Sequence, residues 1–320
     1  MGLWDFLIVQ PIAFLLRNLY EITGNYGVSI IMFAVAAKVV LLWFAYKGKR
    51  GMLQQQRIQP KLQELQKKCG GDKQKMQQEQ AKLYQDEGIS MFGGCLWMFI
   101  PFPIIIALYT AVRQPLRYIL NYSAEKISEL VAALPEGAAK GGFEQLHIAE
   151  TEGLINFEFL GLNLSETPSF ASMLFLIPIL SALTSLLSVW LTQKFSGRPP
   201  AQGNSQIMMF LLGPGMSLWI GFSFPAALGV YWIMQNVLGI PQEYFLSRYW
   251  NRKLDEEDAA KAAKEERRKA AEAVQKEEDR KRRAERIAAS NQKHKPKRYK
   301  LQNTIPPNKP SPKKKGEDGH

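Results

Sequence analysis

The stretch Tyr26–Tyr46, YGVSIIMFAVAAKVVLLWFAY, decides the fold class of this 320-residue chain. It is apolar over roughly 20 residues, the length with which an α-helix crosses the hydrocarbon core of a bilayer. The exception is Lys38, which lies roughly 13 Å of helix from the nearer end. A charged group at that depth costs at least ~2.5–3.5 kcal/mol unless it faces protein or trapped water. Two interpretations remain: Lys38 snorkels toward the cytoplasmic headgroups, or it faces a polar cavity formed by other helices.

Four further apolar segments follow the first one. They are Gly93–Val112, Phe170–Thr192, Gln206–Phe222 and Ala226–Leu246. We expect Pro101 and Pro103 to kink the second segment, and Gly213-Pro214-Gly215 to break the fourth. Ahead of all five, residues 3–22 mix apolar and charged side chains, which suits an interfacial helix better than a span. The sequence therefore predicts an all-α polytopic membrane protein with five transmembrane helices and an N-terminal interfacial helix.

A polar, basic segment, Lys47–Ser90, follows the first span and contains 10 Lys/Arg against 5 Asp/Glu. Two stretches rich in Gln, Lys and Leu, Met52–Lys68 and Lys73–Gln85, predict helices. Between them, Gly70 and Gly71 suit a helix C-cap and a turn, and Asp72 suits the N-cap of the second helix. This pattern predicts a helical hairpin, with a merely solvated linker as the alternative.

Charge asymmetry between the loops predicts the orientation. Lys47–Ser90, Gln193–Ser205 and the C-terminal tail are basic, whereas Gln114–Ser169 carries 3 Lys/Arg against 8 Asp/Glu. Because basic loops stay in the cytoplasm, the N-terminus is expected outside and the C-terminus in the cytoplasm. The expected division is an outer interfacial helix, a five-helix core with a cytoplasmic hairpin and an irregular outer loop, and a basic cytoplasmic tail. The outer interfacial helix is residues 1–25, and the basic tail is residues 247–320. The core is residues 26–246, with the hairpin at 47–90 and the outer loop at 114–169.

The tail carries 23 Lys/Arg against 13 Asp/Glu, a net charge of +10. Asp255–Ala289 is rich in Ala, Glu, Lys and Arg and predicts a polar helix, and from Asn291 onward the composition is typical of disorder. A flexible cationic segment can bind RNA phosphates or anionic lipid, or can serve only to fix the topology. These alternatives stay open.

Polar side chains in the later apolar segments are candidates to line a cavity around Lys38. Four hydroxyl residues in the third segment share one helix face, and the last segment adds two aromatic and two amide side chains. They are Ser181, Ser185, Ser188, Thr192, Tyr231, Trp232, Gln235 and Asn236. Serine and threonine in spanning helices more often join helices to one another, so that simpler role remains open for them.

Groups that could perform covalent chemistry are sparse. The histidines are His147, His294 and His320, which have no metal or triad spacing, and the cysteines are Cys69 and Cys95, which we expect to form neither a disulfide nor a metal site. We therefore expect a protein that is not an enzyme and uses no cofactor and no metal.

Several motifs, in order along the chain, resemble the YidC family of membrane-protein insertases, in the short form typical of Gram-positive bacteria. They are Asn25-Tyr26-Gly27, Gln59-Pro60-Lys61-Leu62, Lys75-Met76-Gln77, Gly93-Gly94-Cys95-Leu96, Phe224-Pro225-Ala226 and Tyr231-Trp232 with Asn236. The resemblance covers roughly residues 3–246. Lys38 stands where the family typically has arginine, Pro101 stands where many relatives have a polar residue, and no early cysteine suits a lipoprotein signal.

The resemblance implies a membrane protein insertase and chaperone, with Lys38 in a water-filled groove. Hydrophilic segments of nascent membrane proteins would pass through that groove, and apolar helices would leave it into lipid. Implied partners are nascent membrane proteins, the bilayer, the ribosome through the basic tail, the Sec translocon and targeting factors, with the chain acting as a monomer. The rivals are a solute transporter or channel, for which no internal repeat is found, and a membrane scaffold, which leaves Lys38 harder to explain.

Overall fold

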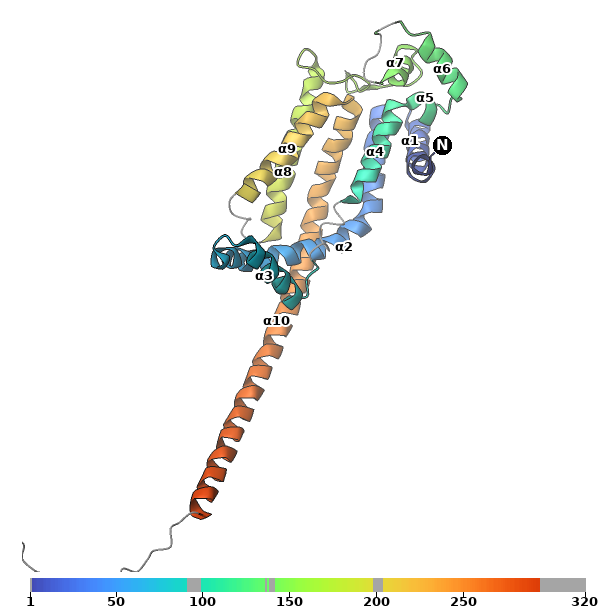
Figure 1. The fold of residues 1–320 in the computed structure, drawn as a ribbon. Helices are drawn as coiled ribbons and strands as arrows, with labels where there is room; N and C mark the ends of the chain where they lie inside the picture. The colour runs from blue at the N-terminus through green and yellow to red at the C-terminus, as the bar shows by residue number, and fades with distance from the viewer. Residues whose placement is uncertain (1, 91–98, 136, 138–141, 198–203, 294–320) are drawn as a thin grey trace, which may run out of the picture. The chain divides into compact units, whose positions relative to one another are not determined.

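The computed structural model describes residues 2–90, 99–135, 137, 142–197 and 204–293, and almost all of the regular structure in them is helical (Figure 1). This confirms the predicted all-α class. Among the described residues, three helical segments are long and apolar enough to cross a membrane: Asp5–Thr23, Tyr26–Cys69 and Met173–Ser196. Two shorter apolar helices, Pro101–Arg113 and Phe210–Ser223, accompany them. The count of five spans and the interfacial placement of the first helix stay predictions. The chain divides into two compact units, Met1–Glu257 and Asp258–His320.

The first apolar span and the first hairpin arm form one helix. After η1 (Asp5–Val9) and α1 (Gln10–Thr23), α2 runs unbroken from Tyr26 to Cys69. The sequence-based division into a span over Tyr26–Tyr46 and a separate hairpin helix over Met52–Lys68 is therefore wrong. No proline occurs in α2 before Pro60, and the glycines near the expected break are accommodated because Gly48 is buried against neighbouring residues.

The start of α2 is fixed by Asn25. Its side chain accepts a hydrogen bond from the backbone N–H of Val28 at 3.1 Å, which caps the helix. Its Nδ2 donates to the backbone oxygen of Glu158 at 2.7 Å, which ties the cap to a segment far along the chain. Gly27 lies so close to Phe159 that a Cβ would sit 2.4 Å from its ring. The capped end of α2 is thus packed directly against β1, in the segment from 114 to 169.

The predicted hairpin turn is present. Gly70 and Gly71 have φ values of 58° and 94°, in the left-handed region that glycine tolerates. Asp72 then accepts hydrogen bonds from the backbone N–H groups of Gln74 and Lys75 at 3.0 and 3.1 Å, and α3 (Lys73–Asp86) begins. Turn and cap follow from local chemistry alone, which explains why the sequence predicts them.

The segment from 114 to 169 is folded rather than irregular, contrary to the expectation. It forms α5 (Pro115–Tyr118), α6 (Ala124–Ala132), α7 (Glu144–Thr151) and an antiparallel pair, β1 (Glu158–Phe159) and β2 (Leu162–Asn163). Its apolar side chains join the hydrophobic core that α1, α2, α4 and the start of α10 share, and they include Leu116, Leu146, Ile148, Ala149 and Leu164. Burial of these side chains outweighs the turn propensity of the glycines.

Asp5 links the N-terminal helical segment to α5. Its carboxylate accepts a hydrogen bond from the hydroxyl of Tyr118 at 2.6 Å and pairs with Arg117 at 3.3 Å. Burial, together with this hydrogen bond, raises the pKa of Tyr118 to about 12. The phenol therefore stays protonated, and remains a donor to Asp5, throughout the physiological pH range.

Within the described residues, the prolines of the apolar segments do not interrupt helices α4 and α9. In α4 (Pro101–Arg113), Pro101 occupies the first helical position, where a missing N–H costs nothing. The predicted second span begins among residues 91–98, outside the described residues. In α9 (Asn204–Ser223), Pro214 lies inside a continuous helix, so the predicted break is wrong. The hydroxyl of Ser217 donates to the carbonyl of Gly213 at 3.0 Å in that region.

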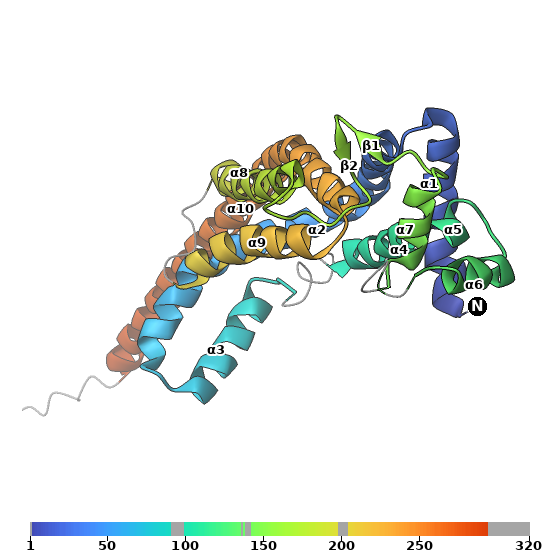
Figure 2. The same ribbon diagram turned by 90° about the horizontal axis from the view of Figure 1, so that it is seen from above.

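Helices α8 and α10 pack against α9, and the start of α10 joins the core. After η3 (Met173–Phe175), α8 (Leu176–Ser196) lies alongside α9, with Gly221 so close to Pro178 that a Cβ would be 2.8 Å away (Figure 2). Helix α10 runs from Ala226 to Lys293 with Pro241 inside it. The expected gap between the last span and a separate tail helix is therefore absent, and residues 247–257 belong to the first compact unit.

We expect Asn25→Ala to lower the free energy of unfolding by about 1–2 kcal/mol, because it removes both the cap of α2 and the bond to Glu158. Asn25→Asp is the matched control, since it keeps the capping acceptor and loses only the donor. Thermal unfolding in detergent measures both. Equal losses for the two variants would contradict a capping role.

Candidate functional site

Lys38 lies between α2 and α10. Its Nζ donates to the backbone oxygen of Gln235 at 3.3 Å, and the side-chain amide of Gln235 donates back to the oxygen of Ala34 at 3.2 Å. Gly239 makes room, because a Cβ there would lie 3.4 Å from the Lys38 ammonium. These reciprocal bonds join the two helices, and they hold the ammonium against α10 instead of extending it along α2.

A pocket of about 690 Å³ opens beside Lys38 at the same seam. Its wall is mostly apolar, and Lys38 and Gln242 are polar members. The apolar lining comes from both helices and includes Val35, Val39, Leu42 and Trp43 of α2 and Leu238 and Phe245 of α10. The polarity next to Lys38 thus comes from a backbone carbonyl and an amide rather than from the expected hydroxyl face.

The hydroxyl face of α8 lies in helix interfaces. Ser181 and Ser185 are buried, and Ser188 and Thr192 are half-buried. The side-chain amide of Asn236 donates to the backbone oxygen of Ser181 at 3.3 Å and to the hydroxyl of Thr184 at 3.2 Å. Among the described residues, the hydroxyl of Ser181 is buried without a hydrogen-bond partner.

Thr184 accepts the hydrogen bond of Asn236, although the helical spacing did not place it on the predicted hydroxyl face. Helix α10 approaches α8 from beside that face. Only the packing of two helices shows this, and no sequence signal identifies it. The contacts of Asn236 match the simpler role of joining helices.

The aromatic pair of α10 faces other neighbours. Trp232 donates its indole N–H to the hydroxyl of Ser217 on α9 at 3.0 Å. Tyr231 is buried, with its ring 6.1 Å from that of Phe33 on α2. Both line a second, apolar pocket of about 180 Å³ next to α4 and α9. The predicted site residues therefore surround α10 on different faces, and among the described residues no hydrogen bond joins Lys38 to the hydroxyls of α8.

A buried ion pair that sequence reasoning missed lies further along the α2–α10 seam. The ammonium of Lys49, only 4% exposed, pairs with Glu243. Glu243 also accepts a hydrogen bond from the hydroxyl of Ser247 at 3.0 Å. The sequence did contain a signal for this pair. Glu243 is an acidic residue within the last apolar segment, where a charge needs a partner, and Lys49 lies just beyond the first apolar segment.

The seam continues past this pair. Trp250 donates its indole N–H to the oxygen of Tyr46 at 3.0 Å, and Leu53, Trp250 and Leu254 form a small buried cluster. Arg57 pairs with Asp255 at 2.7 Å. The first residues of the predicted tail therefore pack against the hairpin arm of α2.

The hairpin candidates are accessible. Lys61 pairs with Glu87, and its side chain remains exposed. The other candidates, all exposed, are Gln59, Pro60, Gly70, Gly71 and Asp72. A partner could reach each of them from solvent.

The sequence profile of the family described as "60Kd inner membrane protein" matches residues 18–253, about three-quarters of the chain. This chain belongs to that family. The matched range contains α2, the hairpin and the α2–α10 seam as far as Lys253, so every candidate residue lies within it. Membership makes the chain a multi-pass protein of the bacterial membrane.

Similar proteins with the name "Membrane protein insertase YidC" occur in several bacteria. The one from Dinoroseobacter shibae is 30% identical over 253 residues, which cover 79% of this chain and 38% of that protein. The one from Nitratidesulfovibrio vulgaris is 29% identical over 77% of this chain and 39% of its own length, and the one from Rickettsia bellii is 27% identical over the same shares. This member of the 60Kd inner membrane protein family thus spans about two-fifths of the length of those relatives.

We expect Glu243→Gln to lower the free energy of unfolding by about 3–5 kcal/mol, because it leaves the buried ammonium of Lys49 unpaired. The double variant Lys49→Met/Glu243→Leu removes both charges and should recover to within about 1 kcal/mol of the parent. Thermal unfolding in detergent compares them. A double variant no more stable than Glu243→Gln would show that the pair is not the source of the loss.

Proposed function

We propose that this chain is a membrane protein insertase and chaperone for nascent membrane proteins. The observation that carries the proposal is family membership over residues 18–253, combined with a lysine held inside the first apolar helix. The relatives named as insertases add support over the same region. The proposal involves no covalent step and no cofactor.

The proposed mechanism is physical. A hydrophilic segment entering hydrocarbon leaves unpaired backbone groups, each of which costs several kcal/mol. The positive charge of Lys38, beside a pocket of about 690 Å³, would attract acidic residues of such a segment and lower that barrier. As a compact point charge, lysine supplies attraction without the bidentate geometry of arginine.

The other candidates have supporting roles in this proposal. Gln235 would position Lys38, and the half-buried hydroxyls of Ser188 and Thr192 would hydrate the passing segment. Ser181, Ser185, Asn236, Tyr231 and Trp232 would hold α8, α9 and α2 around α10, as their contacts suggest. Exposed apolar side chains on α8 and α10, such as Leu183, Leu187 and Val237, would give a departing apolar helix a path into lipid.

The proposed topology has the N-terminus outside and the C-terminus in the cytoplasm, because hairpin 47–90 and tail 247–320 are basic and loop 114–169 is acidic. In this arrangement 1–25 is the outer interfacial helix and 26–246 is the insertase core. The proposed partners are nascent membrane proteins and lipid, the ribosome through the tail, and the Sec translocon and targeting factors through the hairpin. The protein would act as a monomer.

We expect Lys38→Leu to lower insertion activity at least about tenfold, since unit charges about 4 Å apart near a protein surface attract by about 4 kcal/mol and about 1.4 kcal/mol already corresponds to tenfold. Lys38→Arg should keep most of the activity because it keeps the charge. Complementation of a depleted cell, followed by a census of inserted membrane proteins, measures both. Lys47→Leu, which removes an exposed charge from the same helix, is the matched control. Full activity of Lys38→Leu would favour a scaffold.

We expect Lys73→Cys, in a chain otherwise free of cysteine, to react with an impermeant maleimide only when the reagent reaches the cytoplasm. Glu152→Cys in the outer loop should react in intact cells. Both positions are exposed, whereas the native Cys69 is buried and makes a poor probe. Labelling with the sides reversed would overturn the proposed orientation.

A further inference from the structure

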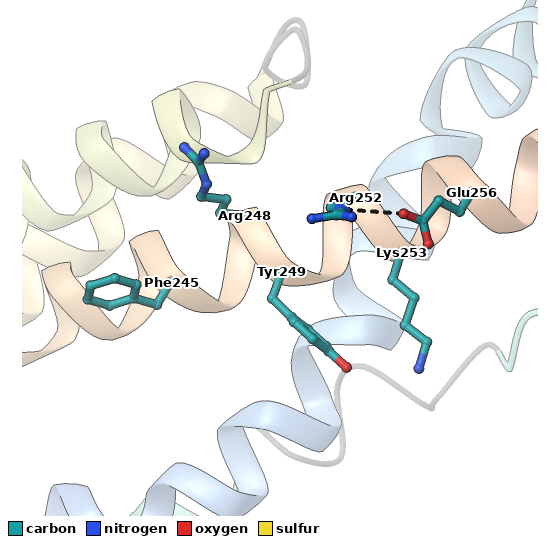
Figure 3. A pocket seen from close by; sticks show the side chains of 6 residues that line it. All are labelled: Phe245, Arg248, Tyr249, Arg252, Lys253 and Glu256. Atoms are coloured by element: carbon teal, nitrogen blue, oxygen red, sulfur yellow. Dashed lines mark hydrogen bonds and ion pairs between the residues drawn. The ribbon is translucent and has the colours of Figure 1, made fainter.

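A cationic pocket of about 510 Å³ lies on α10 just beyond its apolar stretch (Figure 3). It is lined by Phe245, Arg248, Tyr249, Arg252, Lys253 and Glu256. Three cations against one carboxylate leave the lining with a net charge of +2. All of these residues belong to the first compact unit.

The cations of this pocket are available to a ligand. The Arg252 guanidinium pairs with Glu256 at 3.1 Å, but it is 85% exposed and keeps further donors. In the part of the chain that the structure describes, Arg248 makes no ion pair or hydrogen bond. An anion bound here would therefore face at least one arginine with no competing partner.

The cationic pocket adjoins the apolar pocket beside Lys38. Phe245 lines both of them. Tyr249 of the cationic pocket also hydrogen-bonds, hydroxyl to hydroxyl at 3.3 Å, to Tyr46, which lines the apolar one. The two hollows thus form one amphipathic surface along the α2–α10 seam, apolar on the side of the span and cationic beyond it.

The apolar half is open as well as hollow. Val39 and Trp43 on its α2 wall are 67% and 57% exposed, and Phe245 on its α10 wall is 67% exposed. An acyl chain that covers these side chains removes their apolar surface from water, which is favourable. Both pocket volumes fall in the range of roughly 300–1,000 Å³ that is usual for small-molecule sites.

We propose that this seam binds one anionic phospholipid, with its phosphate on Arg248, Arg252 and Lys253 and an acyl chain in the apolar pocket beside Lys38. Guanidinium groups bind phosphate oxygens with paired, charge-assisted hydrogen bonds. Aromatic side chains at the edge of a span favour the headgroup level of a bilayer, where such a phosphate lies. Aromatic and cationic side chains that only face the bilayer surface do not need to line a pocket. Here they line a cationic pocket and an apolar pocket that share Phe245. The site does not depend on the proposed insertase function.

The test uses the full chain in detergent, titrated with phosphatidylglycerol or phosphatidylcholine and followed by native mass spectrometry. Phosphatidylglycerol should bind about tenfold more tightly than phosphatidylcholine. The variant Arg248→Gln/Arg252→Gln/Lys253→Gln should weaken phosphatidylglycerol binding by at least about tenfold, as expected for the loss of several cations near a phosphate. Leu42→Trp, which fills the apolar pocket, should weaken long-chain more than short-chain phosphatidylglycerol.

The matched control is Arg280→Gln/Lys281→Gln/Arg282→Gln, which removes the same charge from exposed residues of α10 outside the site. Its affinity for phosphatidylglycerol should stay within about twofold of the parent. Equal weakening by the two triple variants would reduce the binding to general charge attraction and overturn the site. Equal affinity for the two lipids, or equal competition by soluble glycerol phosphate, would also overturn it. So would a site variant that keeps lipid binding but loses ribosome co-sedimentation, since the cations would then serve RNA.

Discussion

Charged side chains inside an apolar helical bundle must find partners within the protein, and this constraint organises the seam between α2 and α10. Lys38 is held by the carbonyl of Gln235, and Lys49 by the carboxylate of Glu243. Further along, Trp250 bonds to the backbone of Tyr46 and Arg57 pairs with Asp255. Each contact satisfies a group that would otherwise be costly to desolvate. The two helices are consequently joined at successive levels along the seam.

Helix α10 is the common partner of the other apolar helices. Asn236 bonds to α8, Trp232 bonds to α9, and Tyr231 packs against Phe33 of α2. A helix with polar side chains on several faces can hold its neighbours in one arrangement, because each hydrogen bond in a low-dielectric interior is directional. What remains open beside Lys38 is an apolar hollow with one cation on its wall. Under the proposed function, that combination suits transient attraction of a passing polar segment better than tight, stereospecific binding of a polar solute.

The lysine at the seam also separates the two interpretations that its position in the sequence left open. The ammonium contacts the backbone of α10, so it is directed to the protein rather than along its own helix toward the headgroups. The surroundings differ from the polar cavity that was expected, because the hydroxyls of α8 are engaged at other interfaces. An apolar wall leaves the charge of Lys38 less screened than water would, which strengthens its attraction for an acidic residue.

The sequence by itself determined the features that depend on local chemistry or on composition. These are the apolar helix that contains Lys38, the Gly70-Gly71 turn with its Asp72 cap, and the all-α class, since dihedral preferences, capping and hydropathy act within a few residues. Helix continuity was not determined in this way. Helix α2 passes the expected break after Tyr46, α9 passes Pro214, and α10 passes the expected end at Leu246, because packing by neighbours stabilises a helix where local signals are neutral or adverse.

Only the tertiary structure decided which polar groups meet. The pairs Lys38–Gln235, Lys49–Glu243 and Asn236–Thr184 are separated by 197, 194 and 52 residues along the chain, and no spacing rule relates them. The segment from 114 to 169 shows the same limit, since its glycines indicate turns while the burial of Leu116 and Leu164 gives it a fold. Side-chain pairing across helices depends on their rotation and approach, which are set by the sum of all packing contacts rather than by any one segment.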